Sequence, residues 1–336
     1  MRVLFAAGPM KKTLTAMETC RIAKKVFSSD KLFESMPVSD GGDGFLDAVK
    51  HALPDLKEIR INSYSCDMKK IKARVLYSKE RAFIESALCA GVLKGKVSIL
   101  RRSTLGLGVL INELYDNKSS VYVGIGGTLT ADIGCGMLKE LGFDAEEYDG
   151  TSVLKSIRKN KNYSLLYGIS DVKSPLNGKN GASLYLKQKG ANTAEKVLLE
   201  ALFDETADNL KISGKKFSGS GGGIGAGIMI SGGKVLDNFT FFEELTGIKR
   251  KIKESDIIIV NEGNFDRQSF EGKLTGRIVE TAVKMKKRVF VISGGFDAEI
   301  KGIEKIKVNM PKKRNKTGYI REFMNAVQKT KEFIYG

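Results

Sequence analysis

The sequence predicts an α/β protein with a largely parallel sheet, and three features indicate this class. Short apolar runs rich in β-branched residues, such as DIIIV at 256–260, have the composition of buried strands. Segments with apolar residues at helical spacing follow such runs, as in 274–285. Polar loops that contain glycine separate the two kinds of segment. Strands that alternate with helices favour parallel strands joined by helical crossovers.

The individual elements follow from local patterns in chain order. Buried strands are expected at 2–7, 32–38, 121–125, 165–169, 256–260, 288–292 and near 306–308. Partial alternation of apolar and polar residues predicts a more mixed sheet over 57–77 and 82–85. Helices are expected after a capping box at Thr15 and Glu18, at 45–53, after 103–104, through 137–138, at 194–209, at 274–285 and around 320–327.

The chain length and the net charge limit the number of domains and the kinds of partner. A chain of 336 residues is long for one hydrophobic core and predicts two domains. The net charge of +17 attracts anions, but the basic residues are dispersed, and no aromatic residues interleave the densest basic clusters. A solvated, lysine-rich surface is therefore favoured over a face that binds nucleic acid.

The positions of the cysteines and the single histidine limit which metal sites, disulfides and catalytic groups the chain could form. The four cysteines lie far apart, no CxxC motif is present, and His51 is the only histidine. This pattern argues against a zinc site, a disulfide scaffold, and Ser-His or Cys-His catalysis. No apolar run approaches the length of a membrane span, and the first residues are too quickly basic for a signal peptide. We expect a reduced, cytoplasmic setting.

The polar loop between 260 and 274 is the strongest candidate site. It would leave the carboxyl end of a buried strand, where open α/β sheets bind their ligands. Two carboxylates, a guanidinium, an amide and an amine are more than a turn needs. They belong to Glu262, Asp266, Arg267, Gln268 and Lys273. The alternative is a solvated connection in which Asp266 and Gln268 act only as turn and cap residues.

Carboxylates also stand at two other element ends. Asp40 and Asp43 flank two glycines before a helix, a pattern that fits helix capping as well as binding of Mg²⁺ or orientation of a hydroxyl. Glu85 closes an apolar strand and is either a charge at the sheet end or a site residue. Phosphoryl transfer uses carboxylates, cations and loops rich in N–H groups, and it needs no histidine.

The standard nucleotide-binding fingerprints are absent. Lys273 is followed by Leu274 rather than Ser or Thr, and Arg267 stands where a phosphate loop needs its first glycine. The run from Gly221 fits the looser GxGxxA spacing but follows no clear apolar strand. A Rossmann dinucleotide site is therefore poorly supported.

Six motifs stand in a fixed order along nearly the whole chain. They are PVSDGGDGF at 37–45, IESALCAG at 84–91, GIGGTLTADIGCGML at 124–138, DVKSPLNGKNGASLYLKQKGA at 171–191, GGIGAG at 222–227, and the stretch from Val260 to Lys273. Taken together, they resemble the bacterial-type glycerate kinase family (type I). Six ordered matches are specific for common ancestry.

The resemblance implies two α/β domains around a cleft, one of them a Rossmann-like parallel sheet built from both chain ends. Because no proline- or serine-rich linker marks a boundary, the division is drawn from pattern. We expect a Rossmann-like domain at 1–60 plus 240–336 and an inserted α/β domain at 61–239. The resemblance also implies ATP- and Mg²⁺-dependent phosphorylation of a hydroxyl of glycerate, or of a related small hydroxy acid, to phosphoglycerate. A small-molecule partner and no membrane are expected, and a homo-oligomer is left open.

The resemblance carries site residues over by position. The catalytic candidates are Lys11, Asp40, Asp266 and Lys273. The substrate-binding candidates are Asp43, Glu85, Thr128, Asp132, Glu262 and Gln268. The cofactor-binding candidates are Gly126, Gly127, Gly222, Gly223 and Gly225, and the metal candidates are Asp171 and Asp40. Two choices stay open: Asp40 or Asp266 orients the acceptor hydroxyl, and Lys11 or Lys273 neutralises phosphate.

Five positions depart from the family pattern. Gly8, Pro9, Ala131, Lys173 and Asn264 stand where the family has Asp, Ser, Asn, Asp and Arg. Polar groups are thus missing where chemistry or substrate binding would occur, and a buried polar pair that loses one member loses the interaction. The alternative function is a catalytically silent or re-purposed relative that binds an anionic metabolite.

Overall fold

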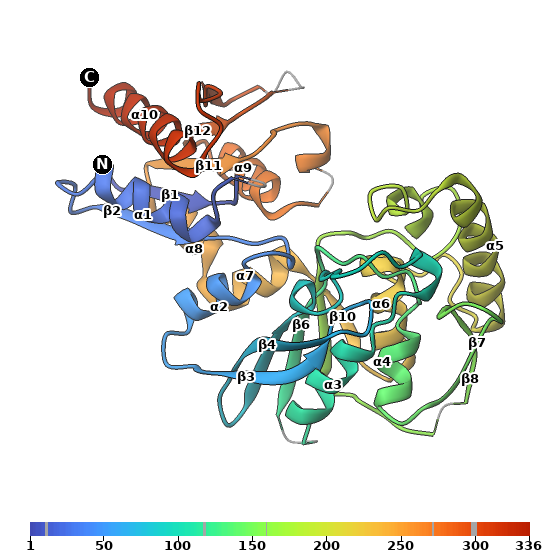
Figure 1. Cartoon of the computed structure of the whole chain (residues 1–336). Coiled ribbons are helices and arrows are strands. Elements are labelled where there is room, and N and C mark those ends of the chain that lie inside the picture. Colours follow the sequence, from blue (N-terminus) through green and yellow to red (C-terminus); the bar gives the residue numbers. More distant parts are fainter. Residues whose placement is uncertain (11–12, 117–118, 159, 271, 297–300) are drawn as a thin grey trace. The chain divides into compact units, whose positions relative to one another are not determined.

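The computed structural model describes residues 1–10, 13–116, 119–158, 160–270, 272–296 and 301–336. The predicted α/β class is confirmed, since helices alternate with mostly parallel strands (Figure 1). The chain divides into two compact units, each with its own sheet. The first unit comprises Met1–Asp40, Asp47–Pro54 and Asn238–Gly336, and the second comprises Gly41–Leu46 and Asp55–Asp237.

The first unit is built on a five-stranded parallel sheet with strands from both ends of the chain. Its order is β13 (Glu304–Lys307), β12 (Arg288–Ser293), β11 (Ile257–Glu262), β1 (Val3–Ala7) and β2 (Phe33–Pro37). This confirms the Rossmann-like sheet expected from both chain ends. β11 is buried over its whole length, as expected for a strand covered on both faces.

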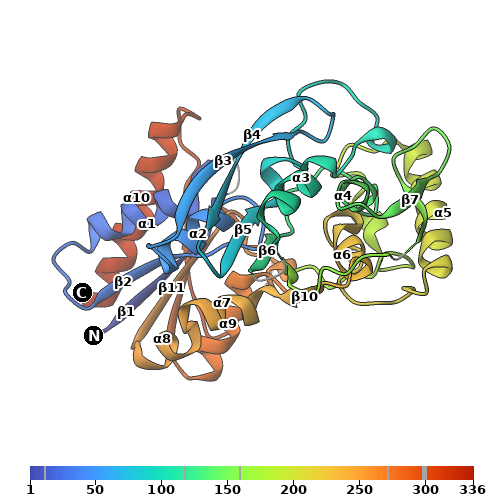
Figure 2. The ribbon, with the colours of Figure 1, turned by 90° about the horizontal axis from the view of Figure 1, so that it is seen from below.

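Helices cover both faces of this sheet (Figure 2). On one face lie α1 (Ala16–Val26) and α10 (Lys316–Tyr335), and on the other lie α7 (Asn238–Thr246), α8 (Ile248–Glu254) and α9 (Leu274–Lys284). Alternate residues of the strands, such as Val3 and Phe5, form one core with the apolar sides of α1 and α10. The two-residue period of a strand explains this alternation.

Capping boxes set the starts of two helices. At α1, the Thr15 hydroxyl accepts from the N–H of Glu18 at 3.2 Å, and the Glu18 carboxylate accepts from the N–H of Thr15 at 2.8 Å. The capping box predicted from the sequence is therefore confirmed. In the second unit, α5 (Thr193–Asn209) begins in the same way at Asn192 and Glu195.

The second unit is built on a six-stranded mixed sheet. Its order is β10 (Lys234–Asp237), β9 (Leu166–Ser170), β6 (Ser120–Gly124), β5 (Arg81–Glu85), β4 (Lys70–Tyr77) and β3 (Lys57–Tyr64). The first four run parallel, and β4 pairs antiparallel with both β5 and β3. The mixed sheet expected over 57–85 is confirmed.

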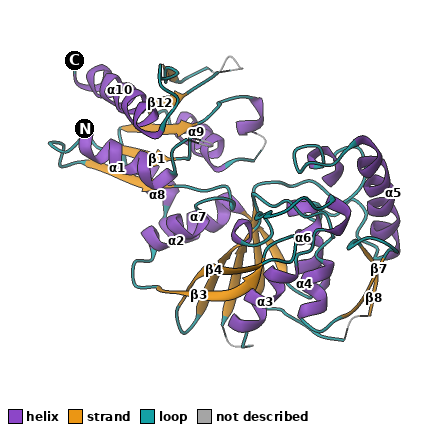
Figure 3. Cartoon of the chain, viewed as in Figure 1, coloured by secondary structure: helices purple, strands orange, loops and turns teal. Residues whose placement is uncertain are grey.

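The helices of the second unit pack against this sheet and one another (Figure 3). α3 (Leu105–Leu114) packs on β3 and β5, α6 (Ser220–Ile230) packs on β9 and β10, and α4 (Cys135–Glu140) contacts both helices. Their apolar residues share one core with the strands. α2 (Phe45–Ala52) begins in the segment Gly41–Leu46 of this unit.

Several short elements have no counterpart among the sequence predictions. They are the antiparallel pair β7 (Asp144–Glu147) and β8 (Leu154–Arg158), together with β10, α6, α7, α8 and the 3₁₀ turns η1 (Ser86–Leu88), η2 (Ile99–Arg101), η3 (Ala182–Tyr185) and η4 (Arg267–Phe270). Elements of this length show too few repeats of an apolar period to be recognised. In the described part of the chain, no helix is both long enough and apolar enough to cross a bilayer.

Candidate functional site

The carboxyl ends of the parallel strands position the predicted site residues of the first unit. β1 and β11 are neighbours, but the chain continues from β1 to β2 on one side and from β11 to β12 on the other. The strand order therefore reverses between β1 and β11. Open α/β sheets bind their ligands at such a switch point. Glu262 is the last residue of β11 and lies at this place.

An ion pair between Glu262 and Lys273 is the centre of this cluster. The Glu262 carboxylate pairs with the Lys273 ammonium and also accepts a hydrogen bond from the Thr275 hydroxyl at 2.8 Å. Glu262 is only 9% exposed, so its charge needs partners within the protein. Lys273 directly precedes α9. The pair therefore ties the start of α9 to the end of β11.

Two more carboxylates are oriented by donors nearby. Asp40 Oδ1 accepts from the N–H of Leu274 at 3.0 Å, at the first residue of α9. Asp266 Oδ1 accepts from the N–H of Ser269 at 3.2 Å, and Asp266 Oδ2 accepts from Asn264 Nδ2 at 3.0 Å. Both aspartates are half-buried. Their carboxylates are thus held in place while part of each side chain reaches solvent.

The electrostatics of the cluster keep Lys273 charged. Partial burial by itself favours the neutral amine, but the carboxylates of Glu262, Asp40 and Asp266 outweigh it. The pKa of Lys273 therefore lies above its ordinary value. Asp40, Glu262, Asp266 and Lys273 are thus brought together by the fold. The result is a persistent cation beside oriented carboxylates.

In the second unit, Glu85 stands at the carboxyl end of β5. Its carboxylate accepts from the N–H of Gly44 at 3.2 Å and from the N–H of Leu46 at 3.1 Å. Glu85 is 6% exposed. The carboxylate therefore holds the segment Gly41–Leu46 against the sheet end and caps the start of α2.

Asp43, Gly126 and Gly127 lie beside Glu85 because two backbone segments approach closely. A Cβ added at Gly126 would lie 2.6 Å from Gly42 Cα, so a larger residue would push these segments apart. A Cβ added at Gly127 would lie 3.2 Å from Asp43 Oδ1. The fold thus places the predicted substrate residue Asp43 next to the predicted cofactor residues Gly126 and Gly127.

Thr128 continues this loop and is tied to a lysine that the sequence predictions did not include. Lys189 Nζ donates to the Thr128 hydroxyl at 2.9 Å and to the carbonyl oxygens of Thr128 and Thr130, each at 3.0 Å. The Thr128 hydroxyl in turn donates to the carbonyl of Gly221 at 3.1 Å. Lys189 is one of 56 basic residues, and only its place within the matched motif at 171–191 could have singled it out.

Asp132 is buried beneath this loop, with 1% of its surface exposed. Its oxygens accept from the N–H and hydroxyl of Thr104, at 2.8 and 2.7 Å, and from the N–H groups of Gly134 and Gly136, both at 3.2 Å. Burial raises the pKa of Asp132 and these hydrogen bonds oppose the rise. We therefore propose that Asp132 acts on a substrate only through the loop that it holds.

The glycines of α6 lie where backbone meets backbone. Residues 221–223 have φ of 64°, 74° and 94°, the left-handed region that glycine adopts readily. A Cβ at Gly222 would lie 2.0 Å from the carbonyl oxygen of Thr130, and one at Gly223 would lie 2.5 Å from Ile133 Cα. A Cβ at Gly225 would lie 2.1 Å from the carbonyl oxygen of Phe217. Close packing therefore explains all three glycines, and cofactor binding by them stays a prediction.

The remaining predicted residues are placed as follows. Asp171 directly follows β9 in the second unit and is half-buried. The other predicted metal ligand, Asp40, belongs to the first unit. Lys11 and the side chain of Gln268 lie outside the described residues. Their roles stay predictions.

The departures from the family pattern have local explanations. The carbonyl of Gly8 accepts from Asn261 Nδ2 at 2.7 Å, and a Cβ at Gly8 would lie 2.4 Å from the Asn261 carbonyl oxygen. Ala131 is fully buried. Lys173 forms an ion pair with Asp237 at 3.1 Å. Asn264, as described, helps to orient Asp266. Gly8 is thus required by a close backbone contact, and Lys173 and Asn264 each have a partner.

The donors of the first unit suit a magnesium-bound polyanion better than a bare metal ion. Among the described residues, no group of three or more His, Cys, Asp and Glu side chains is arranged to hold a metal by itself. Mg²⁺ in nucleotide sites takes one or two carboxylates and completes its coordination with phosphate oxygens and water. Half-buried Asp40 and Asp266, beside the charged Lys273, fit that chemistry.

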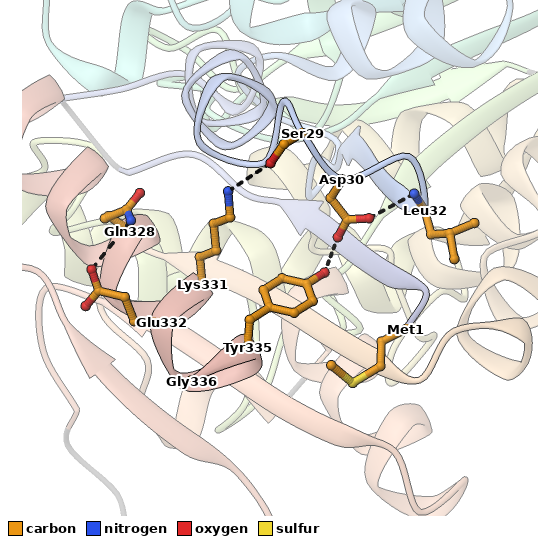
Figure 4. A pocket seen from close by; sticks show the side chains of 9 residues that line it. All are labelled: Met1, Ser29, Asp30, Leu32, Gln328, Lys331, Glu332, Tyr335 and Gly336. Carbon is orange, nitrogen blue, oxygen red and sulfur yellow. Dashed lines mark hydrogen bonds between the residues drawn. The ribbon is translucent and has the colours of Figure 1, made fainter.

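An open cavity of about 580 Å³ in the first unit contains none of the predicted site residues (Figure 4). It lies between the turn that precedes β2 and the end of α10. Its polar groups pair with one another, since Asp30 accepts from the Tyr335 hydroxyl and from the N–H of Leu32. Figure 4 also shows Lys331 directed to Ser29. The cavity therefore offers few polar groups that could bind a ligand.

Comparison with known proteins identifies the family. The model of the glycerate kinase family matches residues 3–333. The chain is 29% identical over 306 residues to a glycerate kinase from Neisseria meningitidis serogroup B, covering 81% of this chain and 80% of that protein. It is 26% identical over 330 residues to the glycerate 2-kinase of Escherichia coli K12, covering 89% and 87%.

A solved structure agrees with this match at the level of the fold. A crystal structure from Salmonella typhimurium LT2, assigned as a glycerate kinase 2, superimposes with a TM-score of 0.79 at 23% identity, covering 99% of this chain and 97% of that one. The family match spans nearly the whole chain. The chain therefore belongs to the glycerate kinase family, and it is a kinase, a phosphotransferase that acts on a hydroxyl group.

Proposed function

We propose that the protein transfers the γ-phosphoryl group of ATP, with Mg²⁺, to a hydroxyl of glycerate or a related small hydroxy acid, giving phosphoglycerate. The observation that carries the proposal is the charged Lys273 held by Glu262 beside two oriented aspartates at the strand switch point. Phosphoryl transfer depends mainly on positioning and on stabilising charge, and this cluster supplies both.

Each side chain of the cluster has a role that its contacts support. Lys273 stays protonated, so it neutralises anionic oxygens that approach the end of β11. The carboxylate of Asp266 is aligned by Ser269 and Asn264 and accepts the proton of the acceptor hydroxyl. Asp40 is the proposed magnesium ligand of this cluster, and a metal role for Asp171 stays a prediction from the family resemblance. Bound MgATP supplies the phosphoryl group and the divalent charge.

The roles of Asp40 and Asp266 are exchangeable in this scheme, because both carboxylates are half-buried and close enough to raise the pKa of Lys273. Asp40→Asn keeps a carbonyl oxygen that accepts from Leu274, so it removes charge with little change in structure. Asp266→Asn likewise keeps an acceptor for Ser269. We expect the variant that lacks the base to lose kcat, and the variant that lacks a metal ligand to need more Mg²⁺.

The test is ADP release from MgATP by purified protein, with and without D-glycerate and a small panel of hydroxy acids. We expect glycerate-dependent turnover that falls by roughly 10²-fold in Asp266→Asn, since removal of a general base costs 10²–10⁴-fold. Turnover with another hydroxy acid but not with D-glycerate would show that the changed positions alter the substrate specificity. The metal requirement is measured by titration of Mg²⁺ in the same assay.

A catalytically silent protein that binds an anionic metabolite is the second candidate. The observation that favours it is the loss of polar groups at Gly8, Ala131, Lys173 and Asn264. No turnover with any acid, together with a melting temperature raised by ATP or D-glycerate, would support this candidate.

A further inference from the structure

The loop of residues 128–132 in the second unit depends on two cations for its shape. Three consecutive carbonyl oxygens of this loop accept hydrogen bonds from cationic side chains. Arg102 Nη1 donates to the carbonyl of Leu129 at 3.1 Å, and Lys189 Nζ donates to those of Thr128 and Thr130, each at 3.0 Å. A buried carbonyl without a partner is costly, so removal of either cation would leave the loop free to rearrange.

Lys189 also joins this loop to the glycines that begin α6. Its Nζ donates to the Thr128 hydroxyl, which itself donates to the carbonyl of Gly221. A Cβ at Gly222 would lie 2.0 Å from the Thr130 carbonyl oxygen and 3.1 Å from Lys189 Nζ. One ammonium group therefore stands where the predicted substrate loop meets the predicted cofactor segment.

The charged neighbours of Lys189 are few and come from several elements. Arg102, which is 6% exposed, donates from Nη1 to the carbonyl of Lys189 at 2.6 Å and from Nε to that of Val97 at 3.2 Å. Removal from water lowers the pKa of Lys189 to about 7, Asp132 and Cys66 oppose this effect, and Arg102 reinforces it. The residue as a whole is half-buried, so its ammonium is enclosed mainly by the oxygens that it contacts.

The turn at 126–128 that precedes these carbonyls is suited to an anion. Gly127 is exposed and has φ of 64°. Within the described residues, no backbone hydrogen bond engages the N–H of Gly127 or of Thr128. Successive free N–H groups in such a turn bind carboxylate or phosphate oxygens.

We propose that Lys189 is a positioning residue of the kinase reaction, which holds the Thr128 hydroxyl and the 126–128 turn in the shape that binds the anionic group of a substrate. This inference rests on the proposed function. The anion is a carboxylate or phosphate oxygen, and it comes either from the hydroxy acid or from the nucleotide. Lys189 itself does not touch the reacting atoms, because its three donors are used within the protein.

The kinetic test compares Lys189→Met, which removes all three donors, with Lys189→Gln, which keeps two. Lys187→Met, two residues away and exposed, is the matched control. In Lys189→Met we expect the KM for one substrate to rise at least ~10-fold while kcat changes less than ~3-fold, with partial recovery in Lys189→Gln. A raised KM for D-glycerate assigns the anion to the acid, and a raised KM for MgATP assigns it to the nucleotide.

The pH profile separates positioning from general structural support. As the pH rises above about 7, Lys189 loses its proton and one of three donors, so the affected KM of the native chain should rise between about pH 7 and 9. The same KM should stay flat with pH in Lys189→Met, which has no group to titrate. A rise of equal size in both proteins would contradict the assignment.

Hydrogen exchange decides the inference even without turnover. The N–H of Leu129 donates to the carbonyl of Ala90 at 2.8 Å, so it reports on the loop. In Lys189→Met, or in Lys189→Gln if the first variant does not fold, we expect this amide to exchange at least ~10-fold faster than in Lys187→Met, while the amides of the first unit keep their exchange rates. Unchanged exchange together with an unchanged KM in a folded variant would overturn the inference. If the native chain turns over no hydroxy acid, the proposed function fails, while faster exchange still supports the holding role.

Discussion

Glu262 illustrates how a single carboxylate organises the first unit. It ends β11, pairs with Lys273 before α9 and accepts from Thr275 within α9. Together with Asp40 and Asp266, it outweighs the effect of burial on Lys273, so the pKa of that lysine lies above its ordinary value. The same residue thus orients a cation and maintains its charge.

A Glu262→Gln substitution tests this role. The amide keeps nearly the same shape but removes the negative charge, so Lys273 loses its ion pair and its alignment. We expect kcat/KM for the kinase reaction to fall by roughly 10²-fold, the size seen when one preorganised electrostatic group is removed. Steady-state ADP release measures the change. Glu254→Gln, which removes an exposed carboxylate paired with Arg250, is the control and should keep full activity. Activity in Glu262→Gln equal to that of the control would contradict the role.

At the scale of elements, the start of α6 is shaped by its contact with the 128–132 loop. The three left-handed glycines do not make a regular helical turn, and they bring the backbone of 221–223 against Thr130 and Ile133. The carbonyls of the loop then pair with Lys189 and Arg102, and the carbonyl of Gly221 accepts from the Thr128 hydroxyl. The glycines are therefore required by packing, whether or not a nucleotide binds beside them.

Two alanine substitutions separate close packing from backbone strain. Gly222 and Gly178 have similar φ, 74° and 82°, but an added Cβ meets the Thr130 carbonyl at Gly222 and nothing within 4 Å at Gly178. Gly178→Ala should cost about 1–2 kcal/mol of unfolding free energy for the left-handed backbone. Gly222→Ala should cost about 1–3 kcal/mol more, because the contact must be relieved. Urea unfolding measures both, and equal losses would show that strain alone matters.

At the scale of the whole molecule, each unit has its own core, and the four cysteines are buried. Cys20 packs in the core of the first unit, and Cys89 and Cys135 pack in that of the second. Burial raises the pKa of Cys20 and Cys89 to about 12 and that of Cys66 to about 11. Burial also raises the pKa of Cys135. The thiolate is the reactive form, so native thiols should be inert.

A thiol titration checks this expectation for the folded chain. At pH 8, none of the four cysteines should react with a small disulfide reagent on the timescale of minutes, because the thiols are protonated and enclosed. All four should react once guanidinium unfolds the chain. Rapid reaction of Cys20, Cys89 or Cys135 in the native protein would show that one of the two cores opens readily.

The sequence by itself determined the fold class, the parallel sheet from both chain ends and the family. Long apolar runs such as β11 are unambiguous, since a strand buried on both faces needs a continuous run of apolar residues. Capping boxes such as that at Thr15 are local and can be read directly. The ordered motifs then pointed to Asp40, Glu262, Asp266 and Lys273, which lie at or after the carboxyl ends of β2 and β11 in one unit.

Only the tertiary structure decided which polar residues act on the site indirectly, by holding other residues in place. Asp132 and Glu85 look alike in sequence as carboxylates within motifs, but their hydrogen bonds hold backbone segments in place. Lys189 is indistinguishable from other surface lysines until the fold places its ammonium against the carbonyls of residues more than fifty positions earlier in the chain. Such roles depend on contacts between distant segments, and these contacts cannot be predicted from local propensity or from the spacing of motifs.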